Sequence, residues 1–251
     1  MSDTRVAVVV PVYGNEDTLP ELVRRLAAAL DGRRWRLRVV VDASPDASLV
    51  VARRLAAADP RIAVTALDSN VGQHRALARG LADEPGAAAW VCLDADLQDP
   101  PEAVPALVDR LAEGDVGAVF AGRRGMYESR GRTLTGRLHR AALARLTGLP
   151  ADAGAFVVMG PAARSAVIAM GGPSIVAAIG AAGVTVASVP VERHRRPSGR
   201  SAWTSTARVR QSAATLVWAA TSGRGLAAAA QVPTGPDRVG TASQRCTSVS
   251  E

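Results

Sequence analysis

Residues 5–12 read Arg-Val-Ala-Val-Val-Val-Pro-Val, an almost unbroken run of apolar side chains. A strand with no polar face is buried on both sides, as in the centre of a parallel sheet that is covered by helices. Similar short runs alternate with helix-length amphipathic segments at 37–42, 62–67, 89–94, 116–121, 155–159 and 184–191. This alternation predicts an α/β fold with one mostly parallel central sheet flanked by helices.

The 251 residues suit one large domain with a short appendage. A helix is expected from Leu19, with Thr18 as its N-cap and Pro20 in its first turn. After the domain, over residues 1–203, the segment 204–230 places Leu216 and Trp218 among basic residues, which predicts an amphipathic helix. The remainder, 231–251, is polar and rich in Gly, Ser and Thr, which predicts a disordered tail.

The composition is strongly basic, with a net charge of +7 and a pI of about 10.9. This charge favours anionic partners such as phosphates or acidic lipids. All 30 basic residues are arginine, however, so a compositional bias explains the excess equally well. Aromatic residues make up 3% of the chain, too few for base-stacking platforms, and we therefore expect no nucleic-acid partner.

The sequence favours a cytoplasmic location. Its two cysteines, Cys92 and Cys246, match neither a disulfide framework nor a metal-binding pair. We expect no signal peptide, because the first apolar run is short and ends in Pro11. No stretch reaches the roughly 20 apolar residues of a spanning helix. A helix over 204–230 with tryptophan and leucine on one side and arginine on the other could lie on the inner face of the plasma membrane or pack against the domain.

The stretch 94–102 reads Asp-Ala-Asp-Leu-Gln-Asp-Pro-Pro-Glu and follows a predicted central strand. Open α/β sheets bind ligands at the carboxyl ends of their strands. In an extended segment Asp94 and Asp96 would project to the same side, so both carboxylates could face one cation and a diphosphate. Hard oxygen ligands favour Mg²⁺ or Mn²⁺. Aspartate clusters also cap turns, and Pro-Pro-Glu is an ordinary helix start.

This stretch resembles the metal-binding signature of family 2 glycosyltransferases, particularly dolichol-phosphate mannosyltransferases and bacterial polyprenyl-phosphate glycosyltransferases. Other segments resemble further elements of the family in the expected order. They are 9–16 (first strand and nucleotide-binding loop), 42–46 (usually Asp-Asp-Gly-Ser), 70–73 (Asn-x-Gly), 152–156 (Asp-x-Gly-Asp-Phe-Arg) and 192–201 (Arg-x-x-Arg-x-x-Gly-x-Ser). The resemblance covers roughly residues 5–204. It implies a GT-A fold, a single nucleotide-binding Rossmann-like domain.

The resemblance also implies a function, which is metal-dependent transfer of a sugar, with inversion, from a nucleotide-sugar to a polyprenyl phosphate at a membrane surface. Metal binding is expected from Asp94, Asp96 and Gln98, and catalysis from Asp96 and Asp152. Donor binding is expected from Pro11, Tyr13, Asn15, Glu16, Asp42, Asn70, Gln73 and Asp94. Acceptor or phosphate binding is expected from Arg123, Arg137, Arg193, Arg196 and Ser201.

At three positions an apolar residue replaces a charged residue of the family pattern. Val41 replaces the first aspartate of the second-strand pair, which leaves Asp42 to contact the nucleoside. Ala155 and Val157 replace an aspartate and an arginine near the expected acceptor site. These changes leave two alternatives open: a soluble transferase that acts on a small-molecule or secondary-metabolite acceptor, and a degenerate domain that binds nucleotide-sugar without turnover. A dinucleotide-dependent oxidoreductase is disfavoured, because the first strand is not followed by G-x-G-x-x-G.

Overall fold

The computed structural model describes residues 5–124, 141–194 and 205–229. Its strands are β1 Val6–Val12, β2 Trp35–Asp42, β3 Ile62–Leu67, β4 Ala89–Cys92, β5 Ala118–Arg124, β6 Val157–Met159 and β7 Val186–Glu192. Its helices are α1 Leu19–Ala29, α2 Ser48–Ala58, α3 Gln73–Asp83, α4 Val104–Ala112, α6 Pro161–Met170, α7 Ile175–Ala181 and α8 Ser205–Ala229. A 3-10 turn at Pro101–Ala103 and a helical segment over 141–147 complete the described elements.

Within the described residues the strands form one seven-stranded sheet in the order β3-β2-β1-β4-β6-β5-β7. β1 pairs in parallel with β2 and β4, β2 with β3, and β5 with β7. β6 runs antiparallel to β4 and β5. The predicted α/β class with a mostly parallel sheet is confirmed. The strand order reverses between β1 and β4, the place where open sheets of this kind bind ligands.

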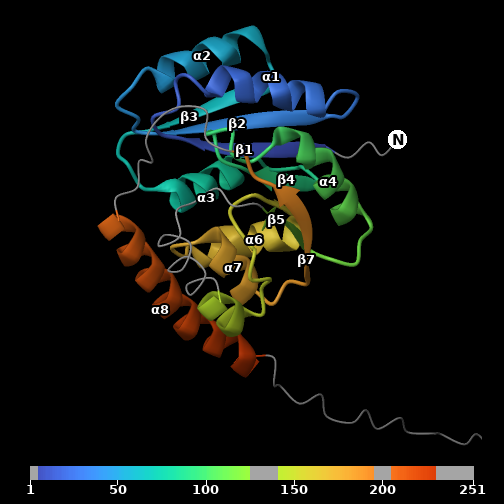
Figure 1. Cartoon of the computed structure of the whole chain (residues 1–251), viewed down its shortest axis with the longest axis vertical. Helices are drawn as coiled ribbons and strands as arrows, with labels where there is room; N and C mark the ends of the chain where they lie inside the picture. The colour runs from blue at the N-terminus through green and yellow to red at the C-terminus, as the bar shows by residue number, and fades with distance from the viewer. Residues whose placement is uncertain (1–4, 125–140, 195–204, 230–251) are drawn as a thin grey trace, which may run out of the picture.

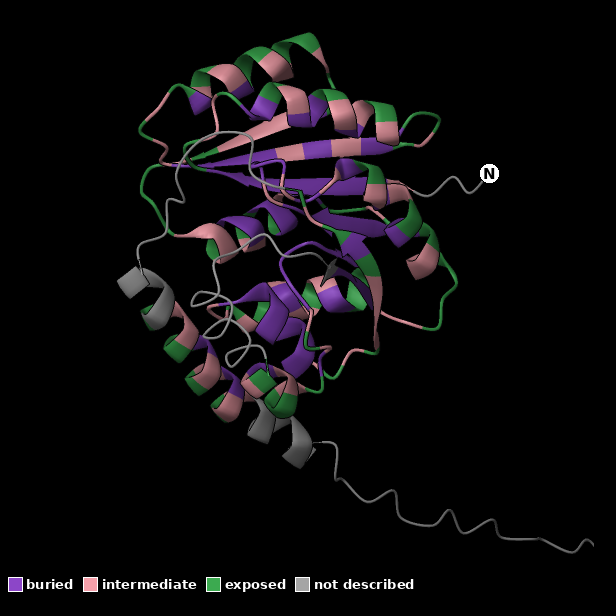
Figure 2. Ribbon diagram, in the orientation of Figure 1, coloured by how far each residue is buried: buried purple, intermediate pink, exposed green. Residues whose placement is uncertain are grey.

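The sheet separates two apolar cores. Figure 1 shows α1 and α2 on one face of the sheet and α3, α6 and α7 on the other, and Figure 2 shows the buried sheet between these layers. Because side chains alternate along a strand, β1 contributes Val8 and Val10 to the first core and Ala7 and Val9 to the second. This double burial explains why the β1 sequence has no polar face.

Gly80 lets α3 lie close to the sheet. An added Cβ at this position would overlap side-chain carbons of Val9 in β1 and Val40 in β2. The absence of a side chain therefore sets how closely this part of α3 packs against β1 and β2.

Two helices between 160 and 184 are not expected from the sequence. In α7 every residue from Ile175 to Ala181 is buried, so the helix has no polar face and its sequence shows no amphipathic period. Among the described helices none alone has both the length and the apolar character needed to cross a membrane; α6 and α7 satisfy that test together only as a pair bent by 111°.

Helix α8 packs against the domain through the side that carries Trp218. The Gln211 side chain donates a hydrogen bond to the Pro173 carbonyl oxygen, and Ala219 is buried in the second core. The ring of Trp218 lies directly over Gly172, where any Cβ would overlap it. Leu216 packs against the same core. Of the two alternatives for the apolar side of this helix, packing against the domain is the one observed, and Val217 is left exposed on the outer side.

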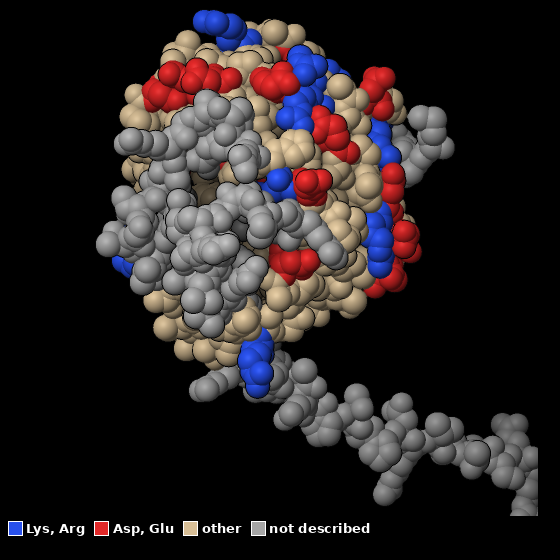
Figure 3. Space-filling view, viewed as in Figure 1, with Lys and Arg blue, Asp and Glu red and all other residues tan. Residues whose placement is uncertain are grey.

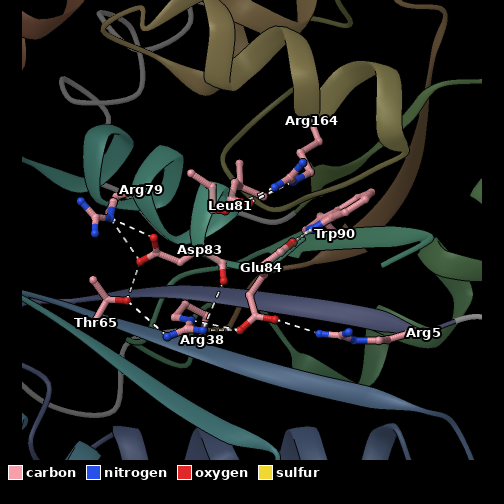
Figure 4. A network of polar contacts seen from close by, with 10 residues as sticks. Arg5, Arg38, Thr65, Arg79, Leu81, Asp83, Glu84, Trp90 and Arg164 are labelled. Carbon is pink, nitrogen blue, oxygen red and sulfur yellow. Dashed lines mark hydrogen bonds and ion pairs between the residues drawn. The ribbon is translucent and has the colours of Figure 1, made fainter. Parts of the chain in front are cut away.

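A polar network lies on the α3 side of the sheet, near the amino ends of β1 and β4 (Figure 4). At its centre the side chain of Glu84 is buried between the guanidinium groups of Arg5 and Arg38, at 3.1 and 2.7 Å. The backbone carbonyl of Glu84 accepts a hydrogen bond from the Trp90 indole. The network ties β1, β2 and β4 to the end of α3.

Charged side chains of both signs are interspersed on the described surface of the face in Figure 3. Among the described residues several arginines pair with neighbouring carboxylates, as in Arg25 with Glu102 and Arg110 with Asp115. On this described surface the basic composition is largely balanced by acidic partners.

Candidate active site

The loops that follow β1 and β2 are held together by hydrogen bonds. The amide of Gly14 donates to the Ser44 hydroxyl at 2.7 Å, and the amide of Glu16 donates to Asp46 at 3.1 Å. In return the Glu16 carboxylate accepts the amide proton of Ala47. Glu16, expected to bind the donor, therefore helps to hold the two loops at the carboxyl edge of the sheet.

Asp46 is the acidic centre of this contact. Burial by itself raises its pKa, but hydrogen bonds from Ser44 and Ser48 outweigh burial and hold the pKa below the usual value. Ala43 has a φ of 48°, in the left-handed region, where the family's second-strand motif usually has glycine. Alanine thus adopts at this turn a conformation that favours glycine, at a cost in backbone strain.

Asp42 ends β2 and is 3% exposed. Its two carboxylate oxygens accept the backbone amide protons of Val71, at 2.7 Å, and of Gly72, at 2.9 Å. Gly72 has a φ of 87° and precedes α3. In this structure Asp42 thus holds the loop before α3, and its contact with a nucleoside stays a prediction.

The other residues expected to bind the donor lie at the same edge of the sheet. Pro11 is buried in β1, where pairing with β4 has already ended at Val9. Asn15 accepts the amide proton of Tyr13 through its side chain and contacts Ser48 through its own amide. Asn70 and Tyr13 are exposed beside them. The structure brings these residues to one edge of the sheet.

The acidic loop, residues 94–99, begins two residues after the end of β4. The expectation of an extended segment was wrong here, because β4 ends at Cys92 and the chain turns at Ala95 and Asp96. Leu97 then has a φ of 60°, a strained conformation of the kind that gathers at functional sites. Cys92 is buried in the second core. Burial, together with the charge of Asp94, raises the pKa of its thiol.

The carboxylates of Asp94 and Asp96 are held by neighbours. The side-chain amide of Gln73, the first residue of α3, donates to Asp94 at 2.5 Å. Asp96 is 8% exposed, and its carboxylate accepts the amide proton of Gln98 at 3.0 Å. Because α3 begins beside Asp94, the positive end of its dipole faces this carboxylate and any phosphate placed next to it.

Two segments far away in sequence anchor the acidic loop. Thr18 was expected to cap α1, but its side chain makes no cap hydrogen bond and its hydroxyl instead donates to the Ala95 carbonyl oxygen at 2.7 Å. From the end of β7, the amide of His194 donates to the Gln98 carbonyl oxygen at 2.9 Å. These contacts, which the sequence did not reveal, position the loop from both sides.

Arg193 is expected to bind phosphate, and the structure places it directly after β7, in contact with the acidic loop. Its guanidinium is largely buried, forms an ion pair with Asp99 at 2.6 Å and lies 3.9 Å from a carboxylate oxygen of Asp94. Asp99 belongs to the quoted acidic stretch but was not expected to have a site role. The observed partner of the Arg193 guanidinium is the Asp99 carboxylate. A contact between Arg193 and a phosphate stays a prediction.

The oxygen ligands that the acidic loop offers to a cation fit Mg²⁺ or Mn²⁺. Within the described residues no group of three or more His, Cys, Asp or Glu side chains converges as a complete metal cage. Such a cage is not required, because Mg²⁺ is usually held by one or two carboxylates together with substrate phosphates and waters. Asp94 and Asp96, with the Gln98 side chain close in sequence, match that kind of partial set.

Asp152 lies in the loop before β6, and its carboxylate accepts the Ser188 hydroxyl at 3.0 and 3.1 Å. Ser188 belongs to β7, so no motif in the sequence connects the two residues. Arg123 ends up near the end of β5, while Arg137, Arg196 and Ser201 lie outside the described residues.

Comparisons with known proteins agree with this geometry. The undecaprenyl-phosphate 4-deoxy-4-formamido-L-arabinose transferase of Pseudomonas aeruginosa (strain LESB58) is 41% identical over 149 residues, which are 57% of this chain and 43% of that protein. The transferase of the same name from Salmonella paratyphi A (strain ATCC 9150 / SARB42) is 40% identical over 113 residues, 44% of this chain and 34% of that protein. The chain spans less than half the length of these relatives.

Among solved structures, glucosyl-3-phosphoglycerate synthase from Mycobacterium tuberculosis, in complex with Mn²⁺, uridine-diphosphate and glucosyl-3-phosphoglycerate, superposes with a TM-score of 0.66. The two chains are 22% identical, and the match covers 87% of this chain and 80% of that one. At this identity the likeness shows the fold, and the predicted GT-A fold is confirmed. The profile of "Glycosyl transferase family 2" matches residues 7–159, from β1 through β6, and the chain therefore belongs to glycosyl transferase family 2.

Proposed function

We propose that this chain transfers a sugar, with inversion, from a nucleotide-sugar to a polyprenyl phosphate in a reaction that depends on Mg²⁺ or Mn²⁺. The observation that carries the proposal is the acidic loop 94–99, held at the sheet's reversal point by Gln73, Thr18 and Arg193. The names of the relatives, which are undecaprenyl-phosphate transferases, support the choice of acceptor.

On the donor side Asp94, Asp96 and Gln98 would hold the cation. When bound, the cation neutralises charge on the diphosphate as it leaves. The start of α3 adds a favourable dipole for the same phosphates, and Asp42 keeps that start in place through Val71 and Gly72. Tyr13 and Asn70, exposed at the edge, are available to contact the nucleoside.

On the acceptor side an oxygen attacks the anomeric carbon from the face opposite the diphosphate. The new carbon–oxygen bond forms as the bond to the diphosphate breaks, and that bond's electron pair leaves with the nucleoside diphosphate. A phosphate acceptor is already ionised at neutral pH, so orientation matters more than proton removal. Asp152 would orient the acceptor or accept its proton, and Arg123, Arg137, Arg196 and Ser201 would bind its phosphate.

A soluble acceptor is the second candidate, and positions 155 and 157 favour it. Ala155 and Val157 are both buried in the second core, and Val157 lies in β6 between β4 and β5. The two charged groups typical of the family are thus replaced by apolar packing. An acceptor site with fewer charges suits a small molecule with a neutral hydroxyl.

The proposed reaction is tested by incubating the purified chain with Mn²⁺ or Mg²⁺, a panel of UDP-, GDP- and dTDP-sugars and a short polyprenyl phosphate. We expect release of one nucleoside diphosphate together with glycolipid, both followed by mass spectrometry. Nucleotide release without glycolipid would favour a soluble acceptor. No release with any donor would contradict the proposal and favour a domain that only binds nucleotide-sugar.

An enzyme with a lipid acceptor acts at a membrane surface. We propose that this chain acts at the inner face of the plasma membrane. The part of α8 available for it is the outer side, where Val217 is 66% exposed and Arg210 is exposed two turns earlier. An apolar side chain on the same helix face as an arginine suits an anionic lipid surface.

We expect Val217→Asp to lower the bound fraction several-fold in flotation with vesicles that contain anionic lipid, because a carboxylate opposes both apolar insertion and the negative surface. The matched control is Val50→Asp on α2, since Val50 is 58% exposed on the opposite layer and its replacement should leave binding unchanged. Equal bound fractions of the wild type, Val217→Asp and Val50→Asp would show that α8 does not contact the membrane.

A further inference from the structure

We propose that Ser188 is a positioning residue for Asp152, and that it holds this carboxylate in the orientation in which it meets the acceptor. The proposal rests on the proposed function and deepens its acceptor side. Its basis is one hydroxyl group from an edge strand, bound to the side chain of a loop residue 36 positions away in the chain.

The contact is specific in geometry. The Ser188 oxygen lies 3.0 Å from one carboxylate oxygen of Asp152 and 3.1 Å from the other, so a single proton is shared between the two. A hydrogen bond to a charged group is about twice as strong as one between neutral groups. The hydroxyl therefore restricts rotation of the carboxylate and leaves its remaining lone pairs for the acceptor.

Gly122 in β5 provides the space for this pair. A Cβ at position 122 would overlap both a carboxylate oxygen of Asp152 and the hydroxyl oxygen of Ser188. The φ of Gly122 does not lie in the left-handed region, so the backbone conformation does not require glycine at this position. The requirement comes from the close approach of the two side chains.

The pair lies at the same edge and face of the sheet as Asp94. Gly122 follows Phe120 by two residues in β5, and Phe120 faces the second core, on the side of α3, α6 and α7. Asp94 likewise follows Cys92 by two residues, and Cys92 faces the same core. The start of α3, on this face, bonds to Asp94 through Gln73. Asp152 therefore lies on the same face and at the same edge of the sheet as Asp94, with β6 between β4 and β5.

The test uses the full chain and steady-state kinetics with the donor and acceptor found by the product assay. We expect Ser188→Ala to lower kcat about 10- to 30-fold, with the donor KM unchanged, because the lost hydrogen bond acts on the acceptor side. Ser188→Thr should keep most of the activity, since it retains the hydroxyl. Melting temperatures of the variants establish that each is folded.

A double-mutant cycle separates positioning from a general structural effect. If Ser188 acts through Asp152, adding Ser188→Ala to Asp152→Asn should cause no further loss in kcat. Gly122→Ala, which displaces the pair, should resemble Ser188→Ala. If the two substitutions lowered kcat by independent factors that multiply, the positioning role of Ser188 would be overturned and the proposed function would stand. The same conclusion would follow if the wild type were active and Ser188→Ala had the same kcat. A wild type without transfer to any acceptor would overturn the proposed function together with it.

Discussion

The Asp96→Asn variant is expected to lose sugar transfer by roughly 10³-fold, the effect of removing several kcal/mol of charge stabilisation at the leaving diphosphate. The substitution is conservative in shape. Asparagine keeps an oxygen that can accept the Gln98 amide proton, which Asp96 accepts at 3.0 Å. The loop should therefore retain its fold, and only the charge is lost.

Binding of Mn²⁺ gives the readout that separates this effect from a loss of structure. Titration of the wild type with Mn²⁺ in the presence of a nucleoside diphosphate should show a binding site that Asp96→Asn weakens by at least tenfold. The matched control is Asp109→Asn in α4, an exposed aspartate paired with Arg33 at 2.9 Å and remote from the acidic loop. An Asp96→Asn variant with unchanged metal dependence and turnover would exclude Asp96 as a metal ligand.

The largest expected effect on stability comes from Glu84→Gln, in the network of Figure 4. The Glu84 side chain is 2% exposed and meets two arginines, Arg5 and Arg38. Removing the negative charge leaves both guanidinium groups uncompensated, and breaking a buried ion pair in this way costs about 3 kcal/mol or more. Because the arginines are partly exposed, we expect the lower end of that range, which corresponds to a melting temperature lower by roughly 6–12 °C.

Thermal and urea unfolding of the variant measure this loss directly. Glu113→Gln is the control, because Glu113 pairs with Arg110 at 3.3 Å with a side chain that is 63% exposed. Surface pairs of this kind contribute at most about 1 kcal/mol. Glu84→Gln and Glu113→Gln proteins with the same unfolding midpoint would show that the network does not stabilise the fold.

Much of the fold was predictable because local patterns carry it. The run 5–12 is apolar on both faces, and the structure shows why: β1 lies between β2 and β4 with a core on each side. The acidic stretch was correctly located after a central strand. The family was recognised from short motifs that keep their order along the chain, and the match over residues 7–159 confirms it.

The errors occurred where local pattern carries little information. Helix α7 is buried all round, so it shows no alternation between polar and apolar faces. Thr18 has the residue type of an N-cap, yet its hydroxyl binds Ala95, 77 positions away. An extended pair of aspartates was expected after β4, but the turn at Leu97 depends on anchors from α1 and β7.

The sequence by itself determined the fold class and the family, and it predicted the edge of the sheet where we propose the site and the residue types that can hold a cation, because side-chain periodicity and motif order are properties of neighbours in the chain. Only the tertiary structure decided which groups position these residues. Asp42 bonds to the loop before α3, Arg193 to Asp99, and Ser188 to Asp152. Each of these partners lies on a separate element, and packing of the sheet and its helices brings them within hydrogen-bonding distance.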